Sequence, residues 1–334
     1  MNNFKKIGMT ALAASLVSTS VFAGALEVTG SASINYENYK APSTGNTASD
    51  STKSFSMGNQ ITFSGSGELD NGLNVKLSFT LDEGDNVDSS SNVTSSVFDG
   101  HSVTVSSDAL GTLVFSGEGG SSAQAKINTT AAGDIWDTFD ARNATSKMKE
   151  SKGANNMFHY TLPTMVDGLA IATSYTPAAG GDESDTAYAL TYTGVEGLTA
   201  KYGVGSNDNQ AAGSGGSTAN ADATTMSLSY VYGSVTLAYS DHDFDSNTAT
   251  SDYSATSAKI SYAVSDAISL TYGEEEMESG TTTDQDAKYS KISASYTAGG
   301  MTVSANVQEV ENGDYSTDAV ADEEYMGLSV SFAF

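Results

Sequence analysis

Residues 327–334 read GLSVSFAF, with an apolar side chain at every second position. Successive side chains of a β-strand point to opposite faces, so Leu328, Val330, Phe332 and Phe334 share one face. Small and hydroxyl side chains occupy the other face. This alternation is typical of a strand that presents apolar side chains to lipid and polar ones to a lumen. The fold is decided by how often the pattern recurs.

The same period-two alternation recurs in sixteen segments along the chain, each bounded by turn residues. Asn71-Gly72, between two such segments, is a strong signal for a tight hairpin. Short and long connections alternate between the segments, as in a barrel with tight turns on one side and loops on the other. The expected strands are 26–38, 55–69, 73–81, 101–108, 111–118, 154–162, 169–176, 186–193, 198–205, 223–232, 234–241, 254–264, 267–273, 288–297, 301–310 and 323–334.

No apolar run after residue 23 is long enough for a transmembrane helix. Because lipid offers no partners to backbone groups, only helices and closed barrels span a membrane. We therefore predict an all-β, transmembrane antiparallel β-barrel of about 16 strands, wide enough for an aqueous channel. A secreted or surface structural adhesin is the alternative, since its β-rich fold would share the abundance of Gly, Ser and Thr.

Residues 1–23 combine Lys5 and Lys6 with a short apolar stretch and small residues, which predicts a secretory signal peptide and export through the periplasm. Residues 24–334 would then form the barrel. The chain has no Cys, which excludes disulfides and thiolate chemistry. Its formal net charge of -27 argues against nucleic acid as a partner.

The longest interior connection, residues 119–152, holds the only Trp and the only Arg of the chain. Asp134 is placed as the N-cap of a short helical turn whose apolar residues would pack on a wall. One interpretation is that this loop folds into the barrel and presents Asp134, Asp137 and Asp140 to the channel. The other is an ordinary exposed loop with a solvated charged turn.

Residues 155–163 (NNMFHYTLP) and 168–175 (GLAIATSY), with the Leu-Gly-Thr segment 110–112, the acidic loop that follows it and the terminal Phe334, resemble the Gram-negative general porins. The resemblance implies a homotrimer of sixteen-stranded barrels in the outer membrane of a Gram-negative bacterium. Each barrel would be a diffusion pore narrowed by an inward-folded third loop, whose acids face a basic wall.

The resemblance carries over to a proposed constriction in this chain. It comprises Asp134, Asp137 and Asp140 in the loop, Lys76 on the opposite wall, and Arg142 and Lys147 shaping the loop. The wall departs from the family pattern, because the single Arg lies in the loop and only Lys76 falls where the basic wall is expected.

This weak basic wall and the negative net charge predict a cation-preferring porin that passes ions and small hydrophilic solutes passively. Outer-membrane lipid and lipopolysaccharide would surround it, and no cofactor is required. The second alternative is a substrate-specific outer-membrane channel. A sugar-specific channel would need a row of aromatic side chains facing the lumen, whereas most Tyr residues fall at the strand positions that carry the apolar, lipid-facing side chains.

Two further chemistries have weak signals in the sequence. The spacing of Asp241, Asp243, Asp245 and Asp252 superficially follows that of a calcium loop, although Ser246 stands where such a loop needs Gly. These acids would equally share one face of a strand that leaves the membrane, so weak Ca²⁺ binding is the most we expect. The three His residues have no Ser at matching depth and parity, so we do not expect an enzyme.

Overall fold

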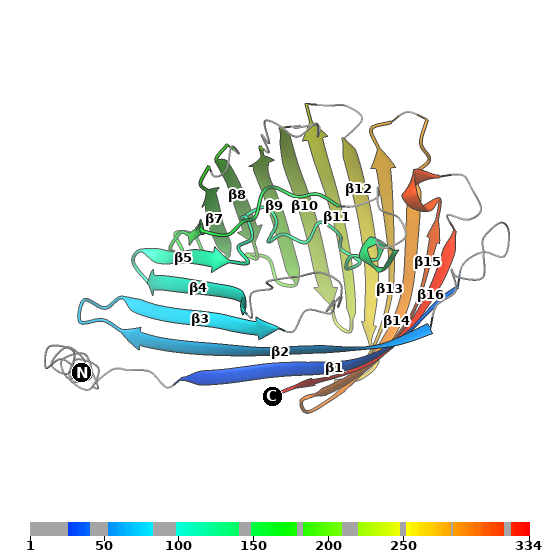
Figure 1. The fold of residues 1–334 in the computed structure, drawn as a ribbon, viewed down its shortest axis with the longest axis horizontal. Helices are drawn as coiled ribbons and strands as arrows, with labels where there is room; N and C mark the ends of the chain where they lie inside the picture. Colours follow the sequence, from blue (N-terminus) through cyan, green and yellow to red (C-terminus); the bar gives the residue numbers. More distant parts are fainter. Residues whose placement is uncertain are drawn as a thin grey trace, which may run out of the picture.

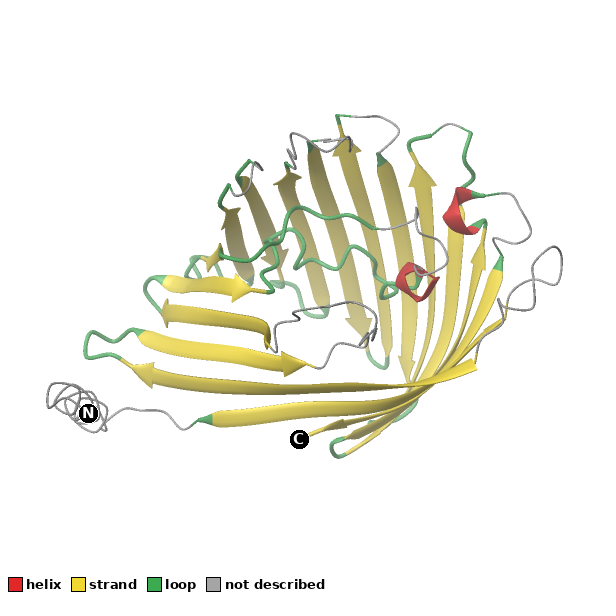
Figure 2. Ribbon diagram, in the orientation of Figure 1, coloured by secondary structure: helices red, strands yellow, loops and turns green. Residues whose placement is uncertain are grey.

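The computed structural model describes residues 26–40, 53–82, 98–139, 148–178, 183–208, 220–247, 252–281, 283–316 and 322–334. The predicted signal peptide, residues 1–23, lies outside these ranges and stays a prediction. Figures 1 and 2 show one curved wall of long strands, with a loop running along its inner side.

The wall consists of sixteen strands. They are β1 (Glu27–Lys40), β2 (Lys53–Glu68), β3 (Asn74–Asp82), β4 (Phe98–Ser107), β5 (Gly111–Glu118), β6 (Met157–Thr161), β7 (Leu169–Thr176), β8 (Asp185–Tyr192), β9 (Leu198–Asn207), β10 (Ala221–Tyr232), β11 (Val235–Ser246), β12 (Tyr253–Ala263), β13 (Ile268–Ser279), β14 (Ala287–Ala298), β15 (Met301–Glu311) and β16 (Glu323–Ala333). The described residues also form two short 3-10 turns, η1 (Trp136–Phe139) and η3 (Gly313–Tyr315). Among the described residues, no helix has the length and apolar character needed to cross a bilayer.

The sheet closes on itself because the first strand pairs with the last. β1 and β16 are antiparallel in the register Ser31↔Ala333 to Lys40↔Glu324. Two backbone bonds complete the seam, from Gly30 N to Phe334 O (2.7 Å) and from Phe334 N to Gly30 O (3.0 Å). Every other strand pairs antiparallel with its neighbours in sequence. The predicted closed, sixteen-stranded, antiparallel barrel is confirmed.

The two faces of the wall have the predicted parity. Large apolar side chains are exposed on one face of each strand, for example Ile34 (57%) on β1, Leu237 (51%) on β11 and Ile292 (64%) on β14. On the opposite parity stand Ser, Thr, Asn and Lys side chains. Exposed apolar side chains on this scale suit a surface that faces lipid.

Several strands run further than predicted, most clearly β11 and β13. Their expected ends were Asp241 and Gly273, but the strands continue to Ser246 and Ser279. The acids in these extensions alternate with buried inward side chains such as His242 and Met277. An acidic segment predicts the start of a loop, but these carboxylates, except the inward Glu275, lie on the outward face of strands that extend beyond the apolar band.

The hydrophobic core lies on the inner face of the barrel. Ile135 and Phe139 of the loop pack with buried side chains of β10 to β16, including Phe244, Met277 and Tyr289. A wide barrel cannot fill its own interior with wall side chains. The loop therefore supplies the second layer of this core.

Candidate functional site

The first part of the connection between β5 and β6 is hydrogen-bonded to polar side chains of β7, β10, β11, β12 and β13 on the inner wall. Four of these side chains accept hydrogen bonds from loop backbone N–H groups. Thr225 accepts instead from the side-chain amide of Gln124 at 2.7 Å. The backbone bonds are Ala123 N to Ser174 Oγ of β7 (2.9 Å), Ala131 N to Ser240 Oγ of β11 (2.7 Å), Ala132 N to Ser257 Oγ of β12 (2.8 Å) and Trp136 N to Glu275 Oε2 of β13 (3.1 Å).

Glycines in the wall let the loop approach closely. A Cβ added at Gly273 of β13 would lie 2.6 Å from the Cβ of Ala132. At Gly203 of β9, an added Cβ would lie 2.7 Å from Cδ1 of Ile127. Real Cβ atoms do not approach other carbons so closely, and the Cβ of Ala132 cannot move independently of its backbone, so Gly273 must be glycine for the loop to keep this position. At Gly203 the close atom is the end of the Ile127 side chain, which can rotate away.

The apolar contacts of the loop agree with the prediction, but its local geometry differs. Ile135 and Phe139 are fully buried, and Trp136 is partly buried against the same core. The expected helix is a single 3-10 turn, and Asp134 does not cap it. Asp134 instead has a positive φ of 50° and exchanges hydrogen bonds with Thr130: its N–H donates to Thr130 Oγ1, and its Oδ1 accepts from that hydroxyl, both at 2.7 Å. The N-cap prediction was wrong because a tight turn from Thr130 competes for this side chain.

The returning arm of the loop (residues 148–156) is hydrogen-bonded to the outgoing arm (residues 119–139) and to the wall. Ser151 N donates to Gln124 Oε1 at 2.7 Å, and the hydroxyls of Ser122 and Ser151 lie 2.5 Å apart. The backbone carbonyl of Lys149 is hydrogen-bonded by the buried ring of His242 at 2.8 Å, and by the hydroxyl of Tyr253. His242 is therefore occupied as a structural anchor.

The structure describes three of the six predicted constriction residues. Asp134 and Asp137 are both exposed on the loop. Lys76 is on the inner parity of β3, which lies halfway round the ring from β11. Asp140, Arg142 and Lys147 lie outside the described residues, so their roles stay predictions.

Sequence reasoning missed Glu150, which lies on the returning arm. Glu150 and Asp134 line one cavity of about 400 Å³ together with Ala125, Asn128, Thr129, Trp136 and Met148. Burial, and next the nearby charge of Asp134, raise the pKa of Glu150 to about 7. The pairing joins residues on opposite arms of the loop, so no local sequence spacing signals it.

The inner wall across from the anchored loop is polar and carries more acids than bases, because Glu27, Glu37, Glu68 and Asp82 share the inner parity of β1 to β3 with Lys76. On β1 to β5 its side chains are mostly hydroxyls and amides, with hydrogen bonds such as Thr62 to Thr80 at 3.1 Å. Lys76 is the only cation on the described inner face of these five strands. Three further inward lysines, on β9, β12 and β14, lie on the side of the barrel that holds the loop: Lys201, Lys259 and Lys291.

The predicted calcium ligands are arranged along a strand. Asp241, Asp243 and Asp245 alternate with buried residues on β11 and therefore share its outward face. Asp252 Oδ1 accepts the backbone N–H of Ser246 at 2.7 Å. This is the arrangement of a strand leaving the membrane rather than of a ligand loop, and calcium binding by these four residues stays a prediction.

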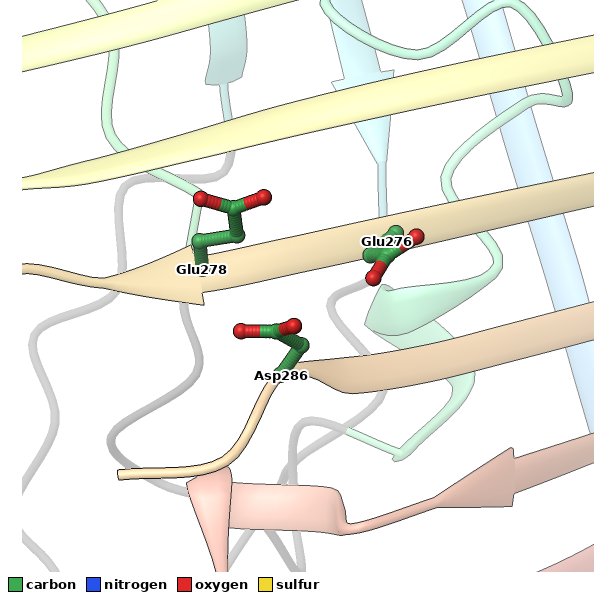
Figure 3. Close-up of side chains that lie close together, drawn as sticks. All are labelled: Glu276, Glu278 and Asp286. Atoms are coloured by element: carbon green, nitrogen blue, oxygen red, sulfur yellow. The ribbon is translucent and has the colours of Figure 1, made fainter. Parts of the chain in front are cut away.

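A different group of described acids lies closer together. Carboxylate oxygens of Glu276, Glu278 and Asp286 lie within 4.8 Å of one another on the outward side of β13 and just before β14 (Figure 3). Lys288 partly compensates this charge through an ion pair with Glu276 at 3.1 Å.

A closed sixteen-stranded barrel with lipid-type side chains outside, polar side chains inside and a loop tied to the inner wall is the architecture of porins. The model of the Gram-negative porin family matches residues 8–334, and the chain belongs to that family. No curated protein matches the sequence.

Solved structures with the same fold differ widely from this chain in sequence. The anion-selective porin from Comamonas acidovorans superposes with a TM-score of 0.67 at 14% identity, covering 93% of this chain and 99% of the other. OmpF of Salmonella typhi, in complex with daunomycin, superposes with a TM-score of 0.65 at 14% identity, covering 92% of this chain and 97% of the other. OmpT of Vibrio cholerae, in a trimer form, superposes with a TM-score of 0.64 at 13% identity, covering 93% of this chain and 100% of the other.

The close approach at Gly273 yields a test of the loop's anchorage. Gly273→Val places a side chain against Ala132 and should cost about 1–3 kcal/mol of packing there. We expect the loop to leave the wall, so that trypsin cuts after Lys126 much faster and single-channel conductance changes. Gly65→Val on β2 is the matched control, because a Cβ there meets nothing within 4 Å. Equal proteolysis of the two variants would contradict the anchorage.

Proposed function

We propose that this outer-membrane porin is a passive, cation-preferring channel for ions and small hydrophilic solutes, narrowed by the loop of residues 119–152. The observation that carries the proposal is the position of the acids. Asp134 and Asp137 are exposed on a segment tied to the inner wall of β7 to β13, across from a wall of hydroxyls, amides and carboxylates.

The cation preference rests on this chain's own side chains. Carboxylates that line a pore lower the energy of cations and raise that of anions. Across the barrel only Lys76 offsets the loop acids on the described parts of β1 to β5. The Comamonas porin is anion-selective, but at 14% identity the likeness extends only to the fold.

A broad solute range fits the same lining. Aromatic side chains of the strands are concentrated on the outward face, for example Tyr188, Tyr230 and Tyr262. The inner face of β1 to β5 offers small hydroxyl and amide groups without a shaped aromatic surface. Such a wall suits diffusion of hydrated solutes, and neither catalysis nor a cofactor enters the proposal.

We further propose that the protein is a homotrimer surrounded by outer-membrane lipid and lipopolysaccharide, reached after export through the periplasm. The trimer form reported for the Vibrio cholerae protein supports the first part. Support for the lipid contact comes from outward acids beyond the apolar band of β11, β13 and β15, among them Asp243, Glu276 and Glu309. Anionic headgroups would be repelled by these carboxylates unless divalent cations lay between them.

Removing the charge of the proposed constriction should weaken cation preference. For Asp134→Asn, Asp137→Asn and Asp140→Asn combined, we expect the cation-to-anion permeability ratio to fall roughly twofold or more, because the loop no longer attracts cations. The measurement is the reversal potential in a planar bilayer under a KCl gradient. The control replaces Glu274, Glu276 and Glu278 by Gln, which removes the same charge from the outward face of β13. An unchanged reversal potential in the loop variant would refute the role of these three aspartates in cation preference.

Cation preference should also depend on pH near neutrality. Burial and Asp134 raise the pKa of Glu150 to about 7, so this carboxyl is charged above that pH and neutral below it. Lowering the pH from 8.5 to 5.5 should therefore reduce cation preference, with a midpoint near 7. In Glu150→Gln the step near pH 7 should vanish, leaving only the titration of ordinary carboxyls at lower pH. A midpoint near 7 that persists in this variant would refute the role of Glu150.

The lipid contact has its own test. Mg²⁺ should raise the temperature at which the protein, folded with lipopolysaccharide, loses its compact band on a gel, and chelation should reverse the effect. Replacing Glu276, Glu278 and Asp286 by Gln, Gln and Asn should abolish most of the Mg²⁺ effect. Asp134→Asn, inside the barrel, serves as the control. Equal Mg²⁺ dependence in both variants would argue against the outward acids.

A further inference from the structure

The cavity between the two arms of the loop has a composition that general diffusion does not require. Carboxylates come from both arms, Asp134 from the outgoing arm and Glu150 from the returning arm. Trp136 and Met148 contribute an aromatic ring and a thioether, and both also pack against the buried core. The arms are held together at Ser122, Gln124 and Ser151, so the cavity has fixed sides.

Among the described residues, no Lys or Arg side chain forms an ion pair with Asp134 or Glu150. Two lysines of the described loop have contacts elsewhere. Lys149 Nζ lies 5.5 Å from the ring centroid of Phe244, and Lys152 Nζ pairs with Asp185 at 3.8 Å. Glu150 has no hydrogen bond or ion pair to its carboxylate within the part of the chain that the structure describes.

Two features of the cavity discriminate between kinds of cation. A strongly hydrated metal ion prefers a complete shell of oxygen ligands. Besides the oxygen groups of Asn128, Thr129 and the two carboxylates, this cavity has an indole ring and a thioether on its sides. An alkylammonium ion suits these groups better, because its charge can meet carboxylates while its carbon atoms contact the ring and the sulfur. The Nε1 atom of Trp136 is also buried and has no hydrogen-bond partner among the described residues. No hydrogen bond of the indole therefore competes with contacts between its ring and a ligand. A volume of about 400 Å³ admits a small organic molecule.

We propose that the cavity lined by Asp134, Trp136, Met148 and Glu150 is a binding site for small organic ammonium ions on their way through the pore. The inference rests on the proposed cation-preferring channel and names a class of solute for which that channel has affinity. Asp134 and Glu150 attract the ammonium group, and Trp136 and Met148 contact its alkyl part. The raised pKa of Glu150 agrees with this arrangement, since a bound cation would relieve the repulsion between the two carboxylates.

The chain itself provides the probe, because Trp136 is its only tryptophan. The full-length protein, folded in detergent at pH 8, is titrated with n-butylammonium chloride at constant ionic strength while tryptophan emission is followed. We expect a saturable change with half-saturation on the order of millimolar. Neutral n-butanol and Na⁺ should produce no saturable change. The absence of saturation with n-butylammonium, or an equal response to Na⁺, would overturn the proposal.

Variants locate the site. Glu150→Gln should weaken n-butylammonium binding roughly threefold to tenfold, and Asp134→Asn should have a similar effect. Glu196→Gln removes the same charge from an exposed turn before β9 and should leave binding unchanged. If Glu150→Gln does not fold, Asp134→Asn carries the test. Unchanged affinity in the folded loop variants would refute the assignment.

Bilayer recordings separate this inference from the proposed function. In a KCl gradient the reversal potential reports cation preference, and added n-butylammonium should reduce the K⁺ current in a saturable manner. Trp136→Leu should weaken this block while the channel still conducts. A cation-signed reversal potential without saturable block would retain the channel and refute the binding site. An anion-signed potential with saturable tryptophan quenching would refute the cation preference alone.

Discussion

A backbone N–H or C=O group in the hydrocarbon of a bilayer has no water to bind, so every strand must find a partner on both sides. In this protein the pairing of β1 with β16 meets that requirement, and the seam is completed by the backbone bonds between Gly30 and Phe334. The alternation of apolar and polar side chains follows from it, since a closed wall has one face in lipid and the other around water. The sixteen-stranded circumference in turn leaves an interior too wide for wall side chains to fill.

The loop between β5 and β6 also needs hydrogen-bond partners for its backbone, and it finds them on the inner face of the barrel. A backbone segment buried against the wall needs partners for its N–H groups, and Ser174, Ser240, Ser257 and Glu275 provide them. Ile135 and Phe139 then bury apolar surface on the inner wall, where no lipid reaches. The contacts that stabilise the loop are therefore also the contacts that set the shape of the channel.

The strands and their faces could be predicted from the sequence because period-two alternation is a local signal. The ends of β11 and β13 could not, since Asp243 or Glu276 looks the same in an outward strand position as in a loop. The side chains that anchor the loop could not be predicted either, because nothing in the sequence distinguishes Ser240 and Ser257 from the other inward serines. Only the folded loop brings its N–H groups to these two hydroxyls. The position of Glu150 could not be predicted because the carboxylate that lies near it, Asp134, is on the other arm of the loop. The N-cap predicted at Asp134 was wrong because its side chain is hydrogen-bonded to Thr130.

The wall recognises the loop mainly through backbone N–H groups, at Ala123, Ala131, Ala132 and Trp136. Every residue except proline offers such a group, so these bonds place little demand on side-chain identity. Residues of the loop that face the channel can therefore be exchanged in evolution while the attachment persists. Ion selectivity can therefore diverge while the frame, with Gly273 against Ala132, is retained.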